Sequence, residues 1–184
     1  QEVLSLLDVM LESGECLMQS HEDVQFFLPR AHTIDRSELE AFIKERKVPV
    51  TIIENHTYDL MQICDVCLAA SGTATLETAM MELPTVLLYK VSPITYGIGK
   101  MVVNLTHVGL PNIVAGKEVI PELLQDDVSV DSIVNTVLPL LDDLHINQSM
   151  RTELRGVKEK LGESGAVNRV AQLIYDLGKE RINE

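Results

Sequence analysis

The sequence predicts an α/β fold in which a Rossmann-like parallel sheet is flanked by helices. Short apolar runs, bounded by small or polar residues, alternate with longer segments whose apolar residues recur at helical spacing. This alternation is typical of βαβ units, in which helices connect parallel strands. With 184 residues, of which 46% are hydrophobic and 23% charged, the chain can build one sizeable core, which indicates a single domain.

The first half of the chain contains the predicted strands. It opens with an amphipathic helix, because apolar residues recur at helical spacing from Val3 to Met18. Strands are expected at 25–29, 50–53, 65–69 and 85–91, and helices at 35–47, 58–64 and 74–82. A sheet of this type normally begins with a strand, and here a helix comes first. That order favours the later part of a longer polypeptide, although residues missing from the given sequence would explain it equally well.

The second half of the chain is predicted to be mainly helical. An apolar helix at 93–105 is followed by a loop at 109–117 that is interrupted by Pro and Gly. Three helices at 129–141, 149–161 and 166–177 close the chain. The apolar side of the first of these four helices is typical of a core or a subunit interface, with contact to acyl chains or a membrane as the alternative.

Composition and charge argue against several classes of function. A net charge of −13 disfavours an unspecific nucleic-acid surface, which needs basic patches. No apolar run approaches the roughly 18 residues that a membrane span requires. The odd number of cysteines fits a reducing compartment, and we interpret Cys64 and Cys67 as core thiols. The histidines show no metal-ligand spacing, so we expect no metal site.

Residues 70–77 form the most informative stretch, because small residues there connect a predicted strand to a predicted helix. Such a turn presents backbone N–H groups and the positive end of the helix dipole, which commonly bind phosphate. Glu77 lies one turn beyond Thr73, so its carboxylate can reach back toward a bound group such as a ribose diol. The pattern predicts a nucleotide-diphosphate site, and the simpler alternative is a plain strand–turn–helix junction.

A second candidate stretch, residues 54–58, follows the strand at 50–53. His56 or Tyr58 could line a pocket for a nucleotide base, and backbone groups near Glu54 could bind the uracil edge. The alternative is a turn in which Asn and Thr cap the following helix. The sequence does not choose between the two interpretations.

Four motifs in a fixed order carry a resemblance to a known family. They are Ala70-Ser71-Gly72-Thr73-Ala74-Thr75-Leu76-Glu77, Tyr89-Lys90-Val91-Ser92-Pro93-Ile94-Thr95-Tyr96, Leu110-Pro111-Asn112-Ile113-Val114-Ala115-Gly116-Lys117-Glu118 and Pro121-Glu122-Leu123-Leu124-Gln125. With these motifs the chain resembles the lipid-A-disaccharide synthases, glycosyltransferases of the GT-B type, and the likeness covers nearly its whole length.

The resemblance implies that residues 1–184 are the C-terminal, nucleotide-sugar-binding domain of a GT-B fold. The family's first strand of this domain, which ends in a Gly-Ser-Arg turn, and its N-terminal acceptor-binding half are then absent from the chain. The implied reaction transfers 2,3-diacylglucosamine from UDP to 2,3-diacylglucosamine 1-phosphate. Its products are a β-1,6-linked disaccharide, with inversion at the anomeric carbon, and UDP. The family needs no cofactor, and its catalytic base is assigned to the missing half.

The resemblance also implies two groups of site residues. The first group, for UDP, is Ser71, Gly72, Thr73, Ala74 and Glu77, with His56 and Tyr58 as candidates near the base. The second group, a substrate loop, is Asn112, Lys117, Glu118 and Gln125. The family often has Arg where this chain has Lys117, and lysine keeps the charge but lacks the bidentate fork.

Partners and location follow from the same resemblance. We expect a UDP-sugar donor, an acylated sugar-phosphate acceptor, a homodimer through the C-terminal helices, and membrane contact through the missing half. The expected location is the cytoplasm, peripheral to the inner membrane of a Gram-negative-type bacterium. Two alternatives stay open: another GT-B-like UDP-N-acetylglucosamine enzyme (a 2-epimerase or a peptidoglycan-precursor transferase), and a non-catalytic nucleotide-binding or dimerisation module.

Overall fold

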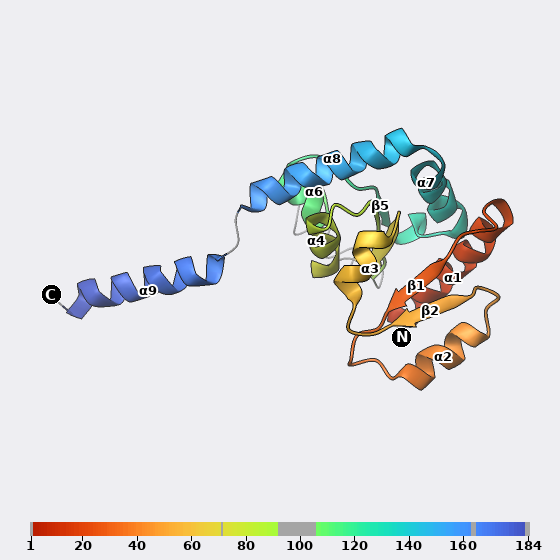
Figure 1. Ribbon diagram of the computed structural model, residues 1–184, viewed down its shortest axis with the longest axis horizontal. Helices are drawn as coiled ribbons and strands as arrows, with labels where there is room; N and C mark the ends of the chain where they lie inside the picture. Colours follow the sequence, from red (N-terminus) through yellow and green to blue (C-terminus); the bar gives the residue numbers. More distant parts are fainter. Residues whose placement is uncertain (1, 71, 92–105, 163–164, 183–184) are drawn as a thin grey trace.

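Two ladders of parallel strands form the centre of the protein (Figure 1). In the first, β1 (Phe26–Pro29) pairs with β2 (Val50–Ile53). In the second, the order is β3 (Cys67–Ala70), β4 (Thr85–Tyr89), β5 (Glu122–Leu124). The predicted class, parallel strands flanked by helices, is confirmed, but among the described residues the sheet is divided between β1 and β3.

The structure is a computed structural model that describes residues 2–70, 72–91, 106–162 and 165–182. Its helices, in chain order, are α1 (Glu2–Ser20), α2 (Arg36–Lys44), α3 (Thr57–Ile63), α4 (Thr73–Met80), α6 (Leu110–Ala115), the 3-10 turn η1 (Gln125–Asp127), α7 (Val130–Asp142), α8 (Leu144–Leu161) and α9 (Ala166–Ile182). The helix expected at 93–105 lies outside the described residues, as does Ser71.

Strand β4 is the centre of the core. Successive side chains of a strand point to opposite faces, and those of Val86, Leu87 and Leu88 are all fully buried. Val86 and Leu88 belong to an apolar cluster with α1 and α7, whereas Leu87 belongs to a cluster with α4, α8 and Ile120. Helices therefore cover both faces of the second ladder, as a parallel sheet requires.

The segment after residue 106 differs most from expectation. The predicted loop at 109–117 is wrong in part, because it contains α6, with Pro111 in its first turn and Gly116 in the left-handed conformation (φ 74°) at its C-terminus. Strand β5 was not expected. Helix α8 begins five residues earlier than predicted, at Leu144, because the Asp143 carboxylate accepts hydrogen bonds from the N–H groups of the first turn.

Helix α9 extends away from the rest of the protein, as Figure 1 shows. Within the described residues, no helix is long and apolar enough to cross a membrane.

Candidate functional site

The junction between β3 and α4 has the geometry of an anion site. Gly72 is the N-cap of α4 and has φ 123° and ψ −156°, a conformation that side chains of L-residues rarely adopt. A Cβ built on Gly72 would meet no atom of the described residues within 4 Å, so among these residues the space in front of its backbone is open. Glycine is thus required here by the backbone conformation, and the same backbone is accessible to a ligand.

Thr75 holds this turn from the inside. Its hydroxyl donates to the Gly72 carbonyl at 2.8 Å, its backbone N–H donates to the same oxygen at 3.3 Å, and its side chain is fully buried. Thr73 and Ala74, which precede it, are exposed. Their N–H groups belong to the first helical turn, which lacks intrahelical acceptors. The two amides therefore have no acceptor within α4, in a turn that Thr75 fixes.

Glu77 lies one turn further along α4, on the helix that follows the turn. It is half-buried, and among the residues that the structure describes its carboxylate takes part in no hydrogen bond or ion pair. An unpaired carboxylate beside open N–H groups can accept hydrogen bonds from hydroxyls while the amides bind an anion. This arrangement suits a sugar diol next to a phosphate.

The second candidate stretch lies at the end of β2, in the other ladder. Asn55 has φ 63°, and His56 Nδ1 is 3.0 Å from the Asp59 carboxylate, with both side chains more than 70% exposed. Tyr58 is also exposed. His56 occupies the N-cap of α3 without a side-chain capping bond, so the simple capping interpretation is wrong. His56 and Tyr58 are accessible to a ligand at the carboxyl end of a strand.

An ion-pair cluster that the sequence did not reveal fixes the end of that strand. The Glu54 carboxylate accepts from Arg30 Nε at 2.9 Å and from Arg36 Nη1 at 3.1 Å. The hydrogen bond from Arg30 is the main reason that the pKa of Glu54 lies below its usual range. Arg30 also donates to the Ile34 carbonyl. Arg30 and Glu54 are 24 residues apart in the chain, so no local sequence pattern could have predicted that they pair.

Asn112 has a different place from the one expected. Its side chain is fully buried: Oδ1 accepts from the N–H groups of Val119 (2.7 Å) and Ile120 (2.9 Å), and Nδ2 donates to the Ile120 carbonyl (2.8 Å) and to Glu122 (2.7 Å). An amide can make four such bonds, and all four are made within the loop. We therefore correct the expectation that Asn112 contacts a substrate directly: its side chain supports the loop.

Glu122 completes this buried node. Its two carboxylate oxygens also accept from the N–H groups of Val108 and Gly109, each at 2.9 Å. The Glu122 side chain, at the start of β5, thus bonds both to the backbone just before α6 and to Asn112 within α6. The only signal in the sequence was an acidic residue in an otherwise apolar strand.

The remaining substrate-loop residues do not form one cluster. Lys117 Nζ is 2.7 Å from the Glu153 carboxylate on α8, with both side chains exposed, and Glu118 is exposed beside it. Gln125 has φ 53° and its amide pairs with the backbone of Val91, donating to the carbonyl at 3.0 Å and accepting from the N–H at 3.3 Å. Lys117 and Glu118 are thus open to a ligand, whereas Gln125 supports the end of β4.

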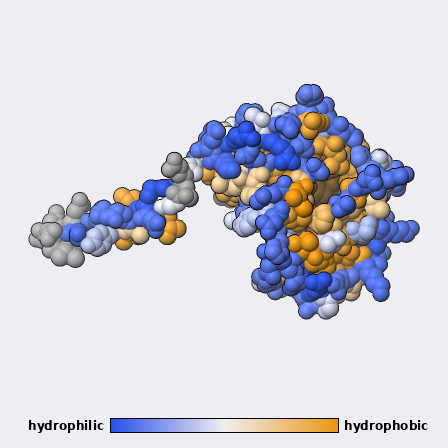
Figure 2. Space-filling model, in the orientation of Figure 1, coloured by the Kyte–Doolittle hydropathy of each residue, from blue (hydrophilic) through white to orange (hydrophobic). Residues whose placement is uncertain are grey.

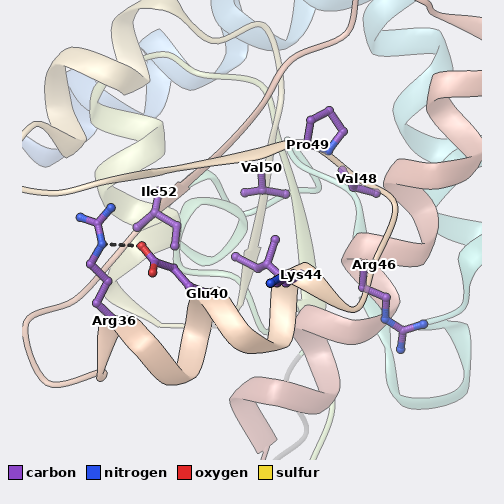
Figure 3. Close-up of a pocket in the computed structure, with 9 residues that line it drawn as sticks. Arg36, Glu40, Lys44, Arg46, Val48, Pro49, Val50 and Ile52 are labelled. Carbon is purple, nitrogen blue, oxygen red and sulfur yellow. Dashed lines mark hydrogen bonds and ion pairs between the residues drawn. The ribbon is translucent and has the colours of Figure 1, made fainter.

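Three further features of the structure involve none of the predicted site residues. A hollow of about 450 Å³ lies between α2 and β2, where Figure 3 shows the Arg36–Glu40 pair opposite Ile52. Its lining comes only from residues 36–52 and includes no predicted site residue. Cys64 and Cys67 are free, and burial raises the pKa of the Cys67 thiol to about 12. Both residues are half-buried, so the expectation of core thiols is confirmed only in part. Among the described residues no group of His, Cys, Asp and Glu could hold a metal.

Comparison with known proteins identifies the family. A family model described as lipid-A-disaccharide synthetase matches residues 1–174. The chain belongs to this family. The lipid-A-disaccharide synthase of Geobacter sulfurreducens is 42% identical over 97% of this chain and 47% of that protein. That of Persephonella marina is 39% identical over 96% and 48%. The chain thus spans about half the length of these synthetase-family relatives.

A solved structure agrees with the GT-B type of α/β fold. A chain titled "Crystal structure of GtfA/B complex" superposes with a TM-score of 0.55 over 96% of this chain and 33% of that chain. At 12% identity this similarity concerns the fold alone. The family match gives no support to the alternative enzymes or to the non-catalytic module.

The Asn112 node generates a prediction about the synthetase-family loop. Replacing Asn112 by Ala should lower the free energy of unfolding by about 2–4 kcal/mol, because it leaves the buried N–H groups of Val119 and Ile120 without an acceptor and removes one of the three donors to the Glu122 carboxylate. In hydrogen exchange, the amides of Val119 and Ile120 should lose protection before those of β4. Glu118→Gln is the control on the exposed part of the same loop and should change neither quantity. Unaltered exchange at Val119 would show that the amide does not hold the loop.

Proposed function

We propose that this chain is the donor-binding half of an inverting glycosyltransferase that transfers 2,3-diacylglucosamine from UDP to 2,3-diacylglucosamine 1-phosphate. The products are the β-1,6-linked disaccharide and UDP. The observation that carries the proposal is the family match across residues 1–174, together with an open Gly72 turn after β3 and the Glu77 carboxylate on α4, which has no partner among the residues that the structure describes. The curated relatives with this activity in their names are about twice as long.

In the proposed site, the β3–α4 turn binds the diphosphate of UDP. The N–H groups of Thr73 and Ala74 and the positive end of α4 would bind the negative charge that grows as UDP departs. Donors fixed in advance by the Thr75–Gly72 bonds stabilise that charge without reorganising. The negative charge on the departing UDP would thus be stabilised by the turn residues Ser71, Gly72, Thr73 and Ala74. Glu77 would bind the ribose hydroxyls. His56 and Tyr58 are proposed to lie near the base, and Lys117 and Glu118 near the rest of the substrate.

The first test concerns Glu77 in the complete polypeptide. Glu77→Ala should weaken UDP binding roughly 10- to 150-fold, since a hydrogen bond to a charged group contributes about 1.5–3 kcal/mol. UDP with both ribose hydroxyls removed should bind the unchanged protein more weakly by a similar factor, and the two losses should not add. Calorimetric titration measures all four combinations.

The matched control for Glu77 is Glu159→Ala, which removes an exposed carboxylate from α8. It should leave UDP affinity unchanged. If the affinity losses from Glu77→Ala and from the missing ribose hydroxyls add fully, Glu77 does not bind the ribose. If Glu77→Ala binds UDP as tightly as the unchanged protein, Glu77 is not part of the site.

A second test separates the roles of the two halves. The isolated 184 residues should form no disaccharide from diacylated substrates, because the proposed catalytic base lies in the half outside this chain. A thin-layer assay with radiolabelled acceptor measures this directly, with the complete polypeptide as the positive control. Turnover by the isolated chain would place the base within residues 1–184.

We also propose that α9 forms a homodimer contact, and that the protein acts in the cytoplasm at the inner membrane of a Gram-negative-type bacterium, touching the membrane through the other half. Helix α9 supports the dimer because it carries a row of apolar side chains that are 54–81% exposed. These are Val167, Val170, Leu173, Ile174 and Tyr175. Most recur at the three- and four-residue spacing of one helical face, and Figure 2 shows apolar surface on this helix away from the rest of the protein.

A pair of substitutions on α9 tests the dimer. Val170→Glu with Ile174→Glu should convert the complete polypeptide to a monomer, since burying two carboxylates in an apolar contact is strongly unfavourable. Light scattering measures the mass. Asn168→Glu with Gln172→Glu adds the same charge to other positions of the same helix and should leave the mass unchanged. A wild-type mass of one chain at all concentrations would contradict the proposal.

A further inference from the structure

Arg30 connects the ends of two strands with the start of a helix. It follows β1 directly, and its backbone N–H donates to the carbonyl of Ile53, the last residue of β2, at 2.9 Å. Its side chain is only 14% exposed: Nε donates to the Glu54 carboxylate at 2.9 Å, and Nη1 donates to the Ile34 carbonyl, just ahead of α2. One side chain thus bonds both to the residue after β2 and to the turn that leads into α2.

Two arginines bond to the same oxygen of Glu54. Arg36, the first residue of α2, donates from Nη1 to Oε1 of Glu54 at 3.1 Å, and it also pairs with Glu40. The hydrogen bond from Arg30 is the first cause of the lowered pKa of Glu54, so the carboxylate stays charged near neutral pH. The Arg36 side chain is 53% exposed, so water and salt screen its bond more than that of Arg30. Arg30 is therefore the stronger of the two anchors for Glu54.

The loop after β2 is held at its two ends. Glu54 holds its start, and α3 holds its end, where the N–H of buried Leu60 donates to the His56 carbonyl at 3.0 Å. Between these points Asn55 has a left-handed backbone (φ 63°), an uncommon conformation outside glycine that neighbouring contacts must maintain. The His56 side chain pairs with Asp59 of the same helix, so it does not tie the loop to the rest of the protein. The conformation at Asn55 thus depends on the bonds of Glu54.

We propose that Arg30 is a positioning residue for the nucleotide base of the donor: through Glu54 it holds the loop 54–58 in its binding conformation. This inference rests on the proposed function, which assigns His56 and Tyr58 to the base. Arg30 itself would touch no ligand, because its Nε and Nη1 groups bond to Glu54 and to the turn before α2. A loop that is held before the ligand arrives loses less conformational freedom on binding, which increases affinity.

The influence of Arg30 should be confined to the base. Its bonds reach residues 34, 53 and 54, all of which belong to the first ladder and its link to α2. The Gly72 turn, proposed for the diphosphate, follows the second ladder and is held by Thr75. Loss of the Arg30 bonds should therefore weaken binding of the base and leave binding of the diphosphate unchanged.

The test compares UDP with an analogue in which hydrogen replaces the uracil, each titrated calorimetrically into the complete polypeptide. Arg30→Met keeps an apolar stem and donates no hydrogen bond. It should weaken UDP binding roughly 3- to 30-fold, as expected for a residue that acts on a site without touching the ligand, and change the affinity for the analogue by less than about 2-fold. Glu54→Met should have the same effect. The double variant should show no further loss, because Arg30 acts through Glu54.

The matched control is Arg46→Met. Arg46 also pairs with two carboxylates, those of Asp8 and Glu12 on α1, and its side chain is 29% exposed. This substitution should leave the ratio of the two affinities unchanged, even where it lowers Tm. A purely structural role of Arg30 would weaken UDP and the analogue by the same factor, or weaken neither, and either result would overturn the proposal. If Arg30→Met does not fold, the double variant with Glu54→Met, which leaves no unpaired carboxylate at position 54, is measured in its place.

The unchanged protein separates this inference from the proposed function. If the unchanged protein prefers UDP to the analogue and Arg30→Met keeps that preference, the role of Arg30 is wrong and the donor site stands. If the unchanged protein binds both ligands equally, the assignment of residues 54–58 to the base fails together with this inference. If it does not bind UDP, the donor site itself is wrong, and the role of Arg30 is wrong with it.

Discussion

The conformation of Gly72 is the constraint on which the candidate site depends. A φ of 123° at Gly72, the N-cap of α4, lies between the half-buried strand β3, which ends at Ala70, and the helix, which begins at Thr73. Two hydrogen bonds from Thr75 to the Gly72 carbonyl hold that turn, and Thr75 is itself fully buried. The side chain that fixes the turn lies on the inner face, so the outer face keeps its N–H groups for a ligand. Any larger residue at position 72 would strain the backbone even though the space in front of it is open.

Polar side chains near the strand ends fall into two groups with different tasks. Asn112, Glu122, Gln125 and Glu54 form hydrogen bonds with the chain itself and hold loops at the ends of β2, β4 and β5. Glu77 has no such bond among the described residues, and it is half-buried rather than fully solvated. A site that binds a rigid ligand needs both groups, because the first removes conformational freedom from the loops and the second leaves hydrogen-bonding capacity for the ligand.

Sequence patterns predicted the elements whose signal is local. The strands at 50–53 and near 65–69 and 85–91, and the long helices, are present because apolar periodicity and small-residue turns reflect short-range geometry. Strand β5 was missed because three residues, one of them Glu122, are too few to show a period. The role of Asn112 was misjudged because its partners lie seven to ten residues away, beyond any turn motif. The Gly72 turn could be recognised from the sequence because its parts lie within six residues, and its role as a binding site stays a prediction.

Helix α1 contributes apolar side chains to the packing of both ladders. Leu17 of α1 belongs to the cluster that contains Val86 and Leu88 of β4, and Leu7 and Leu11 of α1 belong to the cluster that contains Val50 and Ile52 of β2. Phe26 of β1 packs against both clusters, so side chains of α1 and β1 hold the two ladders together. The two candidate loops lie on different ladders: β2 ends at Ile53, three residues before His56, and β3 ends at Ala70, two residues before Gly72. The separation of these loops therefore depends on apolar side chains that lie in neither loop.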